Sequence, residues 1–326
     1  MSGIHDQHIS VGVESTFGTA VTPTRSYEAT ADTFTREVEY IESVGFRADM
    51  QTIRSDRHDT VSLGATGSIE MSVLNKGHGL IMQHLLGTSS GPTQQSSSAA
   101  YKSTFSTNDI GPAGSYTIQA NRADSGGTLR PFTYEGCTAT GFNITQEVGS
   151  PLTMSIDFDA ETEQTSTGSA TAAYPASATP FIWTDAVIEL NDSAVSSFTS
   201  FSLDGDLGMS TSRRFLKGNA TKGQPKRSSV PSYTGTIEAE FEDLTQYNNF
   251  VNGTTFKLEL ICTQGTAIEG SYYPFFHVTL PVCKFTGTTP VASISDLTTI
   301  SLPFTVLHNG TDNAITVEYQ STDTAF

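Results

Sequence analysis

Several short motifs of this chain have residue types that could do chemistry, but none has the complete spacing of a known site. Residues 218–223 resemble a phosphate-binding loop, yet Gln224 stands where the phosphate-contacting lysine is needed. Residues 203–206 offer two carboxylates without the twelve-residue spacing of a calcium loop. Residues 5–8 contain two histidines and an aspartate, but a terminal segment supplies no rigid second shell for a metal. We therefore predict no catalytic residue, no metal site and no cofactor.

A basic segment between Asp206 and Glu238 is the clearest charge feature of the chain. A nucleic-acid surface would need aromatic side chains beside such cations, and only Phe215 is present. Two interpretations stay open: a solvated loop, or a projecting arm that docks on an acidic face of another copy of the chain. The segment has no acidic residue and holds six of the 17 lysines and arginines, namely Arg213, Arg214, Lys217, Lys222, Lys226 and Arg227.

The composition limits both the class of protein and the class of partner. The 326 residues suffice for two domains of about 150 residues, each with its own core. With 34 acidic residues the net charge is −17, which disfavours a general nucleic-acid-binding surface. Abundant Ser, Thr and Gly without long helical periodicity favour an all-β fold. Because no signal peptide and no apolar run of about 18 residues is visible, we expect folding in the cytoplasm and no membrane partner.

An internal repeat organises the chain. Residues 136–158 and 282–304 align without a gap over 23 positions, at an offset of 146. Each copy shows a strand, a glycine-containing turn and a second strand of alternating character, which predicts a β-hairpin. Cys137 and Cys283 occupy equivalent positions, and an odd count of three with Cys262 fits no disulfide framework. We expect buried free thiols that are not bonded to each other.

A strand and a short helix precede each of these hairpins. Residues 67–73 and 235–241 share a G-[ST]-I-E pattern at an offset of 168. A helix is predicted after each strand, over residues 77–87 and 243–253, with Asp243 as N-cap of the second. The order strand, helix, hairpin therefore occurs twice, as expected for a duplicated β domain.

The predicted domains are residues 1–161 and 181–326. Residues 162–180 are rich in Ser, Thr, Ala and Pro and are interpreted as the linker between them. The two offsets differ by 22 residues, so the first copy carries extra sequence between helix and hairpin. The low-complexity tract 88–100 is the candidate for this extra segment, and we expect it to be mobile.

The N-terminal region resembles a known family. Residues 11–34, VGVESTFGTAVTPTRSYEATADTF, and residues 41–47, IESVGFR, are similar to the start of major tail tube proteins of long-tailed, non-contractile bacteriophages. The resemblance is sharpest over residues 9–75, and none of its motifs is catalytic. It implies a mainly β fold of two tandem tail-tube-like domains. Each would be a β-sandwich or partial barrel with one short flanking α-helix.

The resemblance also implies an assembly. In that family six domains form a ring, and rings stack into a tube through which DNA passes. A chain with two such domains would then form trimeric, pseudo-sixfold rings. The implied partners are the chain itself, the tape-measure, tail terminator and distal tail proteins, and double-stranded DNA that passes without specific binding. The implied location is the virion tail, assembled in the host cytoplasm.

Two groups of residues are candidates for that function. Glu70 and Glu238 lie at matched places on matched strands and are the candidate lumen-facing acids, which would repel DNA phosphates. The candidate contacts between rings are the basic residues of two arms, namely Arg47, Arg54 and Arg57 in the first copy and Arg213, Arg214, Lys217, Lys222, Lys226 and Arg227 in the second. We expect that neutralising Arg213, Arg214, Lys217, Lys226 and Arg227 weakens ring stacking while folding survives.

Two other classes of function compete with this hypothesis. A two-domain β-sandwich binding module, such as a phage decoration protein or an adhesin, would be a monomer or a closed oligomer. A β-sandwich glycosidase would need paired carboxylates in a cleft, and no cluster in the sequence recommends such a pair. We therefore predict a structural protein and not an enzyme.

Overall fold

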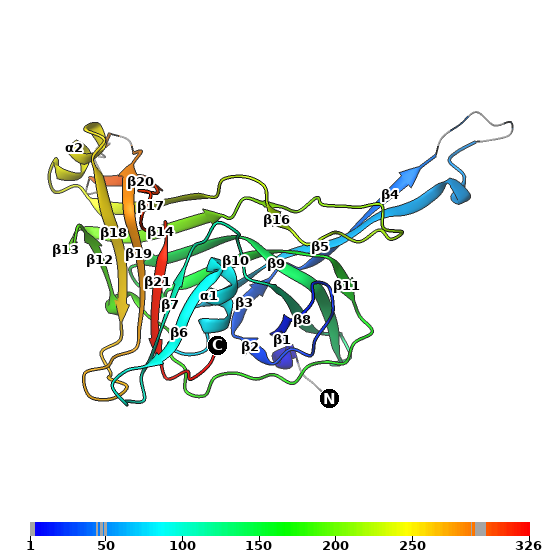
Figure 1. The fold of residues 1–326 in the computed structure, drawn as a ribbon, viewed down its shortest axis with the longest axis horizontal. Helices are drawn as coiled ribbons and strands as arrows, with labels where there is room; N and C mark the ends of the chain where they lie inside the picture. Colours follow the sequence, from blue (N-terminus) through cyan, green and yellow to red (C-terminus); the bar gives the residue numbers. More distant parts are fainter. Residues whose placement is uncertain (1–3, 44, 46–47, 49–50, 288, 291–297) are drawn as a thin grey trace.

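The computed structural model describes residues 4–43, 45, 48, 51–287, 289–290 and 298–326. It is built almost entirely of antiparallel strands, with two short α-helices (Figure 1). The first half of the chain contains β1 (His8–Glu14), β2 (Arg25–Tyr27), β3 (Ala29–Asp32), β4 (Thr35–Glu42), β5 (His58–Ser72), α1 (Gly79–Leu86), β6 (Thr88–Gln94), β7 (Tyr101–Ser106), β8 (Ser115–Ala123), β9 (Leu129–Glu147), β10 (Thr153–Ala160) and β11 (Thr162–Gln164).

The second half repeats this order without the β6–β7 pair. It contains β12 (Ala186–Leu190), β13 (Ser193–Ala194), β14 (Phe198–Asp206), β15 (Met209–Ser210), β16 (Lys226–Arg227), β17 (Ser232–Glu240), α2 (Thr245–Val251), β18 (Thr255–Thr263), β19 (Phe275–Phe285), β20 (Thr299–Val306) and β21 (Thr316–Ser321). Short 3-10 turns lie at Ile4–Asp6, Ser55–Arg57 and Trp183–Asp185. The predicted mainly β fold with one short helix per half is confirmed.

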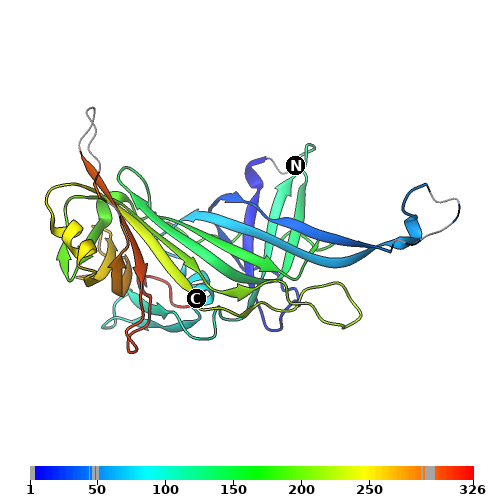
Figure 2. The same cartoon turned by 90° about the horizontal axis from the view of Figure 1, so that it is seen from above.

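One central sheet runs through both halves. Its hydrogen-bonded order is β3 and β4, then β5, β10, β9, β14, β17, β20 and β19. Strand β9 also pairs through its N-terminal part with β8, and β1 and β2 continue from there. At the other end, β19 pairs with β18 and β21, and β18 continues to β12. Figures 1 and 2 show the sheet with the β4–β5 hairpin projecting far from its end.

The central sheet has one apolar face and one polar face because its strands alternate. In β17, Ile237 and Ala239 are buried, whereas Thr236 and Glu238 point to the opposite side. A row of apolar side chains crosses the sheet at 1% exposure or less, namely Met71, Met154, Ile144 and Leu203. Full burial of each such side chain contributes about 1.5–3 kcal/mol. This apolar face is the main core of the molecule.

The two predicted hairpins form with equivalent pairing. Ala139 pairs with Phe158 in β9–β10, and the repeat partners Phe285 and Phe304 pair in β19–β20. The preceding strands agree as well, because Gly67 faces Phe158 and Gly235 faces Phe304. The offsets of 146 and 168 found in the sequence are therefore both conserved in the strand register.

A glycine is needed at both of these positions because another chain segment approaches closely. A Cβ on Gly67 would lie 2.5 Å from the backbone of Phe34, and one on Gly235 would lie 2.2 Å from the Ser202 carbonyl oxygen. Such distances are too short for any side chain to be tolerated without a shift of the backbone. The shared glycine of the G-[ST]-I-E pattern is thus required in each half for the same reason, which is the close approach of another chain segment.

The extra sequence of the first half is a strand pair. Strand β6 pairs with β7, and β7 pairs with β21 of the second half. The tract 88–100, for which we expected mobility, contains the strand Thr88–Gln94. The prediction that the insertion lies between helix and hairpin is confirmed, and the insertion adds a contact between the two halves.

The segment predicted as a linker is bound along the first half. Thr162–Gln164 forms β11, which pairs with β9. Further on, the Ala170 N–H donates to Gln119 at 2.6 Å, and the backbone of Ala173 exchanges hydrogen bonds with Ser26. Because strands β9 and β14 also pair across the predicted boundary, one sheet spans both halves. The division into two domains stays a prediction.

The two helices occupy equivalent places but differ in burial. In α1 nearly every side chain is buried, and Gly87 ends the helix with a φ of 83°. In α2 no residue is buried, and Val251 is 59% exposed. Both predicted helices are confirmed. The Asp243 carboxylate accepts the Thr245 N–H at 2.7 Å, although the residue that directly precedes the helix is Leu244.

Candidate functional site

The polar face of the central sheet is the largest candidate functional surface. Its rows of side chains run across both halves: Glu70, Ser155, Asn143 and Asp204 face one another on β5, β10, β9 and β14. The Asn143 amide donates to the Asp204 carboxylate at 2.7 Å, across the boundary between the halves. The strand residues 58–72, 138–147, 153–160, 198–206, 232–240 and 299–306 include no Lys or Arg. This face is therefore negatively charged.

Glu70 and Glu238 both lie on this polar face. Glu70 pairs with Ser155 and is exposed, and Glu238 pairs with Ser301, the repeat partner of Ser155. The Ser301 hydroxyl donates to the Glu238 carboxylate at 2.5 Å. Their placement on one face is a finding, whereas their position in a lumen stays a prediction.

Further acidic side chains on the same face were missed by the sequence reasoning. They alternate with buried residues along the strands. The two-residue periodicity of a β-strand in the sequence could therefore have identified them. They are exposed and come from β9, β10, β14 and β17, namely Glu147, Asp157, Asp204, Asp206 and Glu240.

The basic segment 207–231 folds back as an arm on the first half of its own chain. We call these residues the second arm. Lys222 is its anchor: the side chain is 5% exposed, and its ammonium group lies 2.6 Å from Asp159 and 2.8 Å from Glu37. The backbone joins as well, because the Leu63 N–H donates to the Ala220 carbonyl at 2.9 Å. The arm thus docks on an acidic site, but within one chain.

Burial and the lysine act differently on the two carboxyl groups. Burial raises the pKa of Asp159 above its usual value, although the hydrogen bond from Lys222 opposes that shift. The more exposed Glu37 has its pKa lowered, chiefly by the hydrogen bond from Lys222. Because Asp159 is buried beside a cation, its ionised form depends on that cation for compensation.

The other basic residues of the second arm also have contacts within the chain. Arg214 donates to the Ser62 hydroxyl at 3.0 Å, and Lys217 lies 3.4 Å from Glu161. Arg213 donates to the Gln224 carbonyl at 2.6 Å, and Arg227 donates to the Asn108 carbonyl. The Lys226 backbone pairs with Ser210 in the β15–β16 ladder, and its side chain is exposed. A role of these residues between rings stays a prediction.

Two of the candidate basic residues of the first half lie at the end of the β4–β5 hairpin. We call residues 43–57, which connect β4 to β5, the first arm. Arg54 forms an exposed pair with Asp56 at 2.6 Å, and Arg57 is exposed in the 3-10 turn beside it. Arg47 lies outside the described residues. Figure 2 shows this arm extended away from the rest of the chain.

The cysteines are packing residues. Cys137, Cys262 and Cys283 are free and buried, as predicted. Burial raises the pKa of the Cys262 and Cys283 thiols to about 12, so these thiols are not nucleophilic at neutral pH.

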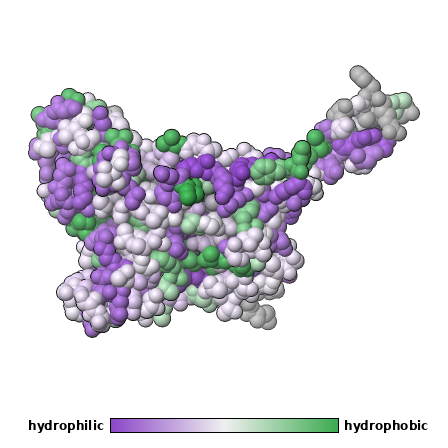
Figure 3. All heavy atoms as spheres, viewed as in Figure 1, coloured by the Kyte–Doolittle hydropathy of each residue, from purple (hydrophilic) through white to green (hydrophobic). Residues whose placement is uncertain are grey.

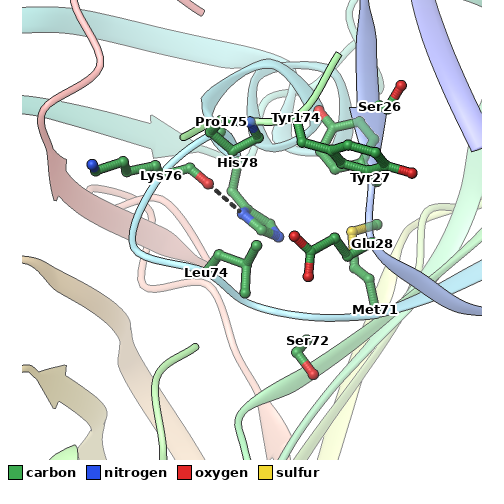
Figure 4. A pocket seen from close by; sticks show the side chains of 11 residues that line it. Ser26, Tyr27, Glu28, Met71, Ser72, Leu74, Lys76, His78, Tyr174 and Pro175 are labelled. Atoms are coloured by element: carbon green, nitrogen blue, oxygen red, sulfur yellow. Dashed lines mark hydrogen bonds between the residues drawn. The ribbon is translucent and has the colours of Figure 1, made fainter. Parts of the chain in front are cut away.

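A small cavity beside α1 contains a buried histidine. The His78 Nδ1–H donates to the Lys76 carbonyl at 3.3 Å, and the ring lies edge-on to Tyr27 (Figure 4). Burial lowers the pKa of His78 to about 4, so the ring is neutral at pH 7. The lining combines apolar side chains such as Met71 and Leu74 with polar ones such as Glu28 and Lys76.

Other local features with chemical potential lack the required setting. Residues 87–91, GTSSG, have G-x-S-x-G spacing, but they join helix α1 to strand β6, whereas a nucleophile elbow joins a strand to a helix. Among the described residues no group of three or more His, Cys, Asp or Glu side chains could hold a metal ion. No helix in the described part of the chain is long and apolar enough to cross a membrane.

The comparisons with known proteins identify one family. A search of curated proteins found no match. A family model for the phage tail tube protein matches residues 5–306, which is nearly the whole chain. The chain therefore belongs to the phage tail tube protein family, whose members are structural components of the virion tail.

Proposed function

We propose that this chain is a major tail tube subunit that forms trimeric, pseudo-sixfold rings. The rings stack into a tube with an acidic lumen for double-stranded DNA. The observation that carries the proposal is the pairing of β9 with β14, which joins two equivalent units side by side in one sheet. Repeating that junction between chains would join six units from three chains and close a ring.

The first half has a strand edge suited to such a junction. Strand β14, which pairs with β9, corresponds in the repeat to β3 and the start of β4. Among the described residues, β3 and β4 pair only with β5, so their other edge has backbone groups available to a neighbour. An open edge at the end of a sheet favours strand addition by a second copy.

The charge of the polar face supports its assignment to the lumen. The part of this surface on β5, β14 and β17, which carries Glu70, Asp204 and Glu238 and has no Lys or Arg, repels phosphate groups. Repulsion prevents the counterion-releasing contacts by which basic proteins hold DNA. Genome passage without specific binding follows from that chemistry. The tape-measure, tail terminator and distal tail proteins complete the proposed set of partners, with assembly in the host cytoplasm.

Negative-stain electron microscopy of the purified chain tests this proposal. We expect tubes or rings with threefold symmetry, and native mass spectrometry of isolated rings should give three chains. A monodisperse monomer across a concentration series would contradict the proposal and would favour a decoration protein or an adhesin.

The lumen assignment has its own test in tubes of the Glu70→Lys/Glu238→Lys double variant. We expect these tubes to retain short fluorescent DNA duplexes at low salt and to release them as salt rises, because added cations contact phosphates. Wild-type tubes should retain none. Lysine at Glu28 and Glu189, which lie away from this face, is the matched control. Equal DNA retention in both variants would remove Glu70 and Glu238 from the lumen.

A further inference from the structure

The two arms are equivalent parts of the repeat, but only one of them is docked. The first arm lies between β4 and β5, and the second arm lies between the equivalent strands β14 and β17. Continuing the alignment of β5 with β17 toward the N-terminus places Arg54 on Lys222 and Ile53 on Thr221. In the chain by itself, the second arm covers the first half and the first arm projects (Figures 1 and 2).

The docked arm defines a set of receiving residues in the first half. Thr221 donates to Glu161 at 2.6 Å, and Lys222 is held by Asp159 and Glu37. Arg214 adds the contact with Ser62. Each of these receiving residues has a counterpart in the second half through the register of the repeat. The counterparts of Glu161, Asp159, Glu37 and Ser62 are Leu307, Thr305, Asp206 and Val230.

Three of these four counterparts are exposed in the second half, and Thr305 is partly buried. Leu307 is 40% exposed and Val230 is 89% exposed, and Asp206 is exposed beside them in the repeat geometry. The acidic position of Glu161 has thus become apolar, and one of the two anions around the anchoring cation, Glu37, remains acidic as Asp206.

The first arm differs from the second arm in the matching way. The residue equivalent to Thr221 is Ile53, which is 38% exposed, and the residue equivalent to Lys222 is the cation Arg54. Figure 3 shows apolar side chains along the projecting hairpin, where Ile41 is 56% exposed and Val61 is 40% exposed. Where the receiver changes from Glu to Leu, the arm changes from Thr to Ile, so the pair stays complementary. Exposed apolar side chains gathered on a projection mark an interaction surface.

From this correspondence we propose that the first arm docks on the second half of a neighbouring copy of the chain. Ile53 packs on Leu307, and Arg54 pairs with Asp206. The proposal rests on the proposed self-assembly and names the surface that joins the chains. The joint within a chain is ionic and buried, whereas the joint between chains is mainly apolar with one charge pair.

One backbone contact is not repeated between the chains. The Leu63 N–H donates to the second arm, but its counterpart Pro231 has no N–H to donate. The contact between chains therefore depends on side chains more than the contact within the chain does. Arg54 must also exchange its exposed pair with Asp56 for Asp206, and such an exposed pair contributes little to stability.

Chemical cross-linking of the Ile53→Cys/Leu307→Cys double variant tests the contact directly. The three native thiols are buried, so a short bis-maleimide should react with the introduced cysteines only. We expect head-to-tail covalent dimers and cyclic trimers on denaturing gels of assembled protein. The matched control is Val13→Cys/Leu307→Cys, because Val13 is 52% exposed on β1, away from the arm. It should give several-fold fewer linked chains.

A charge reversal separates this inference from the proposed ring. Arg54→Glu should lower the cross-linking yield several-fold, and adding Asp206→Arg should restore most of it. If wild-type chains form rings or tubes and the cysteine pair gives no more product than the control, the docking surface is wrong while the ring stands. If wild-type chains form neither rings nor tubes, the proposed function fails, and this contact fails with it.

Discussion

The two halves of the chain share strand order and register but differ in what covers them. In the first half, α1 is buried beneath the β6–β7 insertion, and the C-terminal Phe326 packs on Gly79 and on Phe105. In the second half, no such insertion exists and α2 has no buried residue. The same order of strands and helix therefore forms a unit with a buried helix in the first half and a unit with an exposed helix in the second half.

The arms show the opposite asymmetry. The second arm is anchored by the buried Lys222, whereas the described residues at the end of the first arm are exposed. The arm is thus docked within the chain when it belongs to the second half, and it is exposed when it belongs to the first half. The difference shows that the strand pairing of a duplicated domain follows from its local sequence. The burial of its helix and its arm depends on which neighbouring segment covers them. Breaking single contacts in each half should show the same asymmetry.

The largest effect is expected at the anchor between the halves. Lys222→Ala leaves Asp159 buried without a cation, which typically costs about 3–5 kcal/mol of unfolding free energy. Urea denaturation of the monomeric chain at low protein concentration measures this change.

The matched control for that change lies in the second half. Lys257→Ala removes pairs with Asp192 and Glu259 from a lysine that is 33% exposed. The expected cost is below about 1 kcal/mol because solvent screens such pairs. Equal losses in the two variants would show that the anchor is no stronger than a surface pair.

The next effect compares equivalent positions of the two helices. Alignment at the terminal glycines places Leu85 of α1 on Val251 of α2. Leu85 is 1% exposed, so Leu85→Ala should cost about 2–4 kcal/mol through lost burial and a cavity. Val251→Ala, at 59% exposure, should change the stability of the isolated chain by less than about 0.5 kcal/mol. Thermal unfolding of both variants measures the contrast, and a similar drop in melting temperature would refute it.

A smaller effect should appear as pH falls, and it belongs to the first half. His84 of α1 accepts the Ala139 N–H at Nε2, at 3.0 Å, and donates to the Ala113 carbonyl through Nδ1, at 2.7 Å. Burial lowers its pKa from 6.5 to about 4. Between these values the unfolded chain binds a proton and the folded chain does not. Stability is therefore full above pH 6.5 and decreases as pH falls toward 4.

Replacement of the histidine tests that origin of the pH dependence. The equivalent residue in α2 is Phe250, which cannot titrate. His84→Gln should be less stable than wild type at pH 7 but should lose less stability between pH 7 and 4.5, by about 1–3 kcal/mol. The exposed His308 provides the control, since His308→Gln should keep the wild-type slope. An unchanged slope in His84→Gln would remove His84 as a cause.

Much of the local structure could be predicted because it depends on short-range patterns. The repeat at 136–158 and 282–304, the G-[ST]-I-E strands and the glycine-terminated helices each use periodicity or turn chemistry that the sequence contains. Strand alternation also placed Glu70 and Glu238 opposite their apolar neighbours. The strand at Thr88–Gln94 was not predicted, because it forms by pairing with β7 and its own low-complexity composition does not indicate a strand.

The placement of the arms could not be predicted in the same way. Arg54 and Lys222 occupy equivalent positions of the repeat, and no local pattern distinguishes a docked arm from a free one. The carboxylates that hold Lys222 are 63 and 185 residues away along the chain. Contacts at such separations depend on the assembled sheet.

The sequence by itself thus determined the strands, their faces and their repetition, because side-chain alternation and turn geometry act over a few residues. Only the tertiary structure decided that both halves share one sheet through β9 and β14. Only the tertiary structure decided that the acids of both halves form one face, and that one arm folds back while the other projects. These features depend on contacts between segments that are far apart in the chain. The free energy of burying such segments against each other cannot be derived from a local sequence pattern.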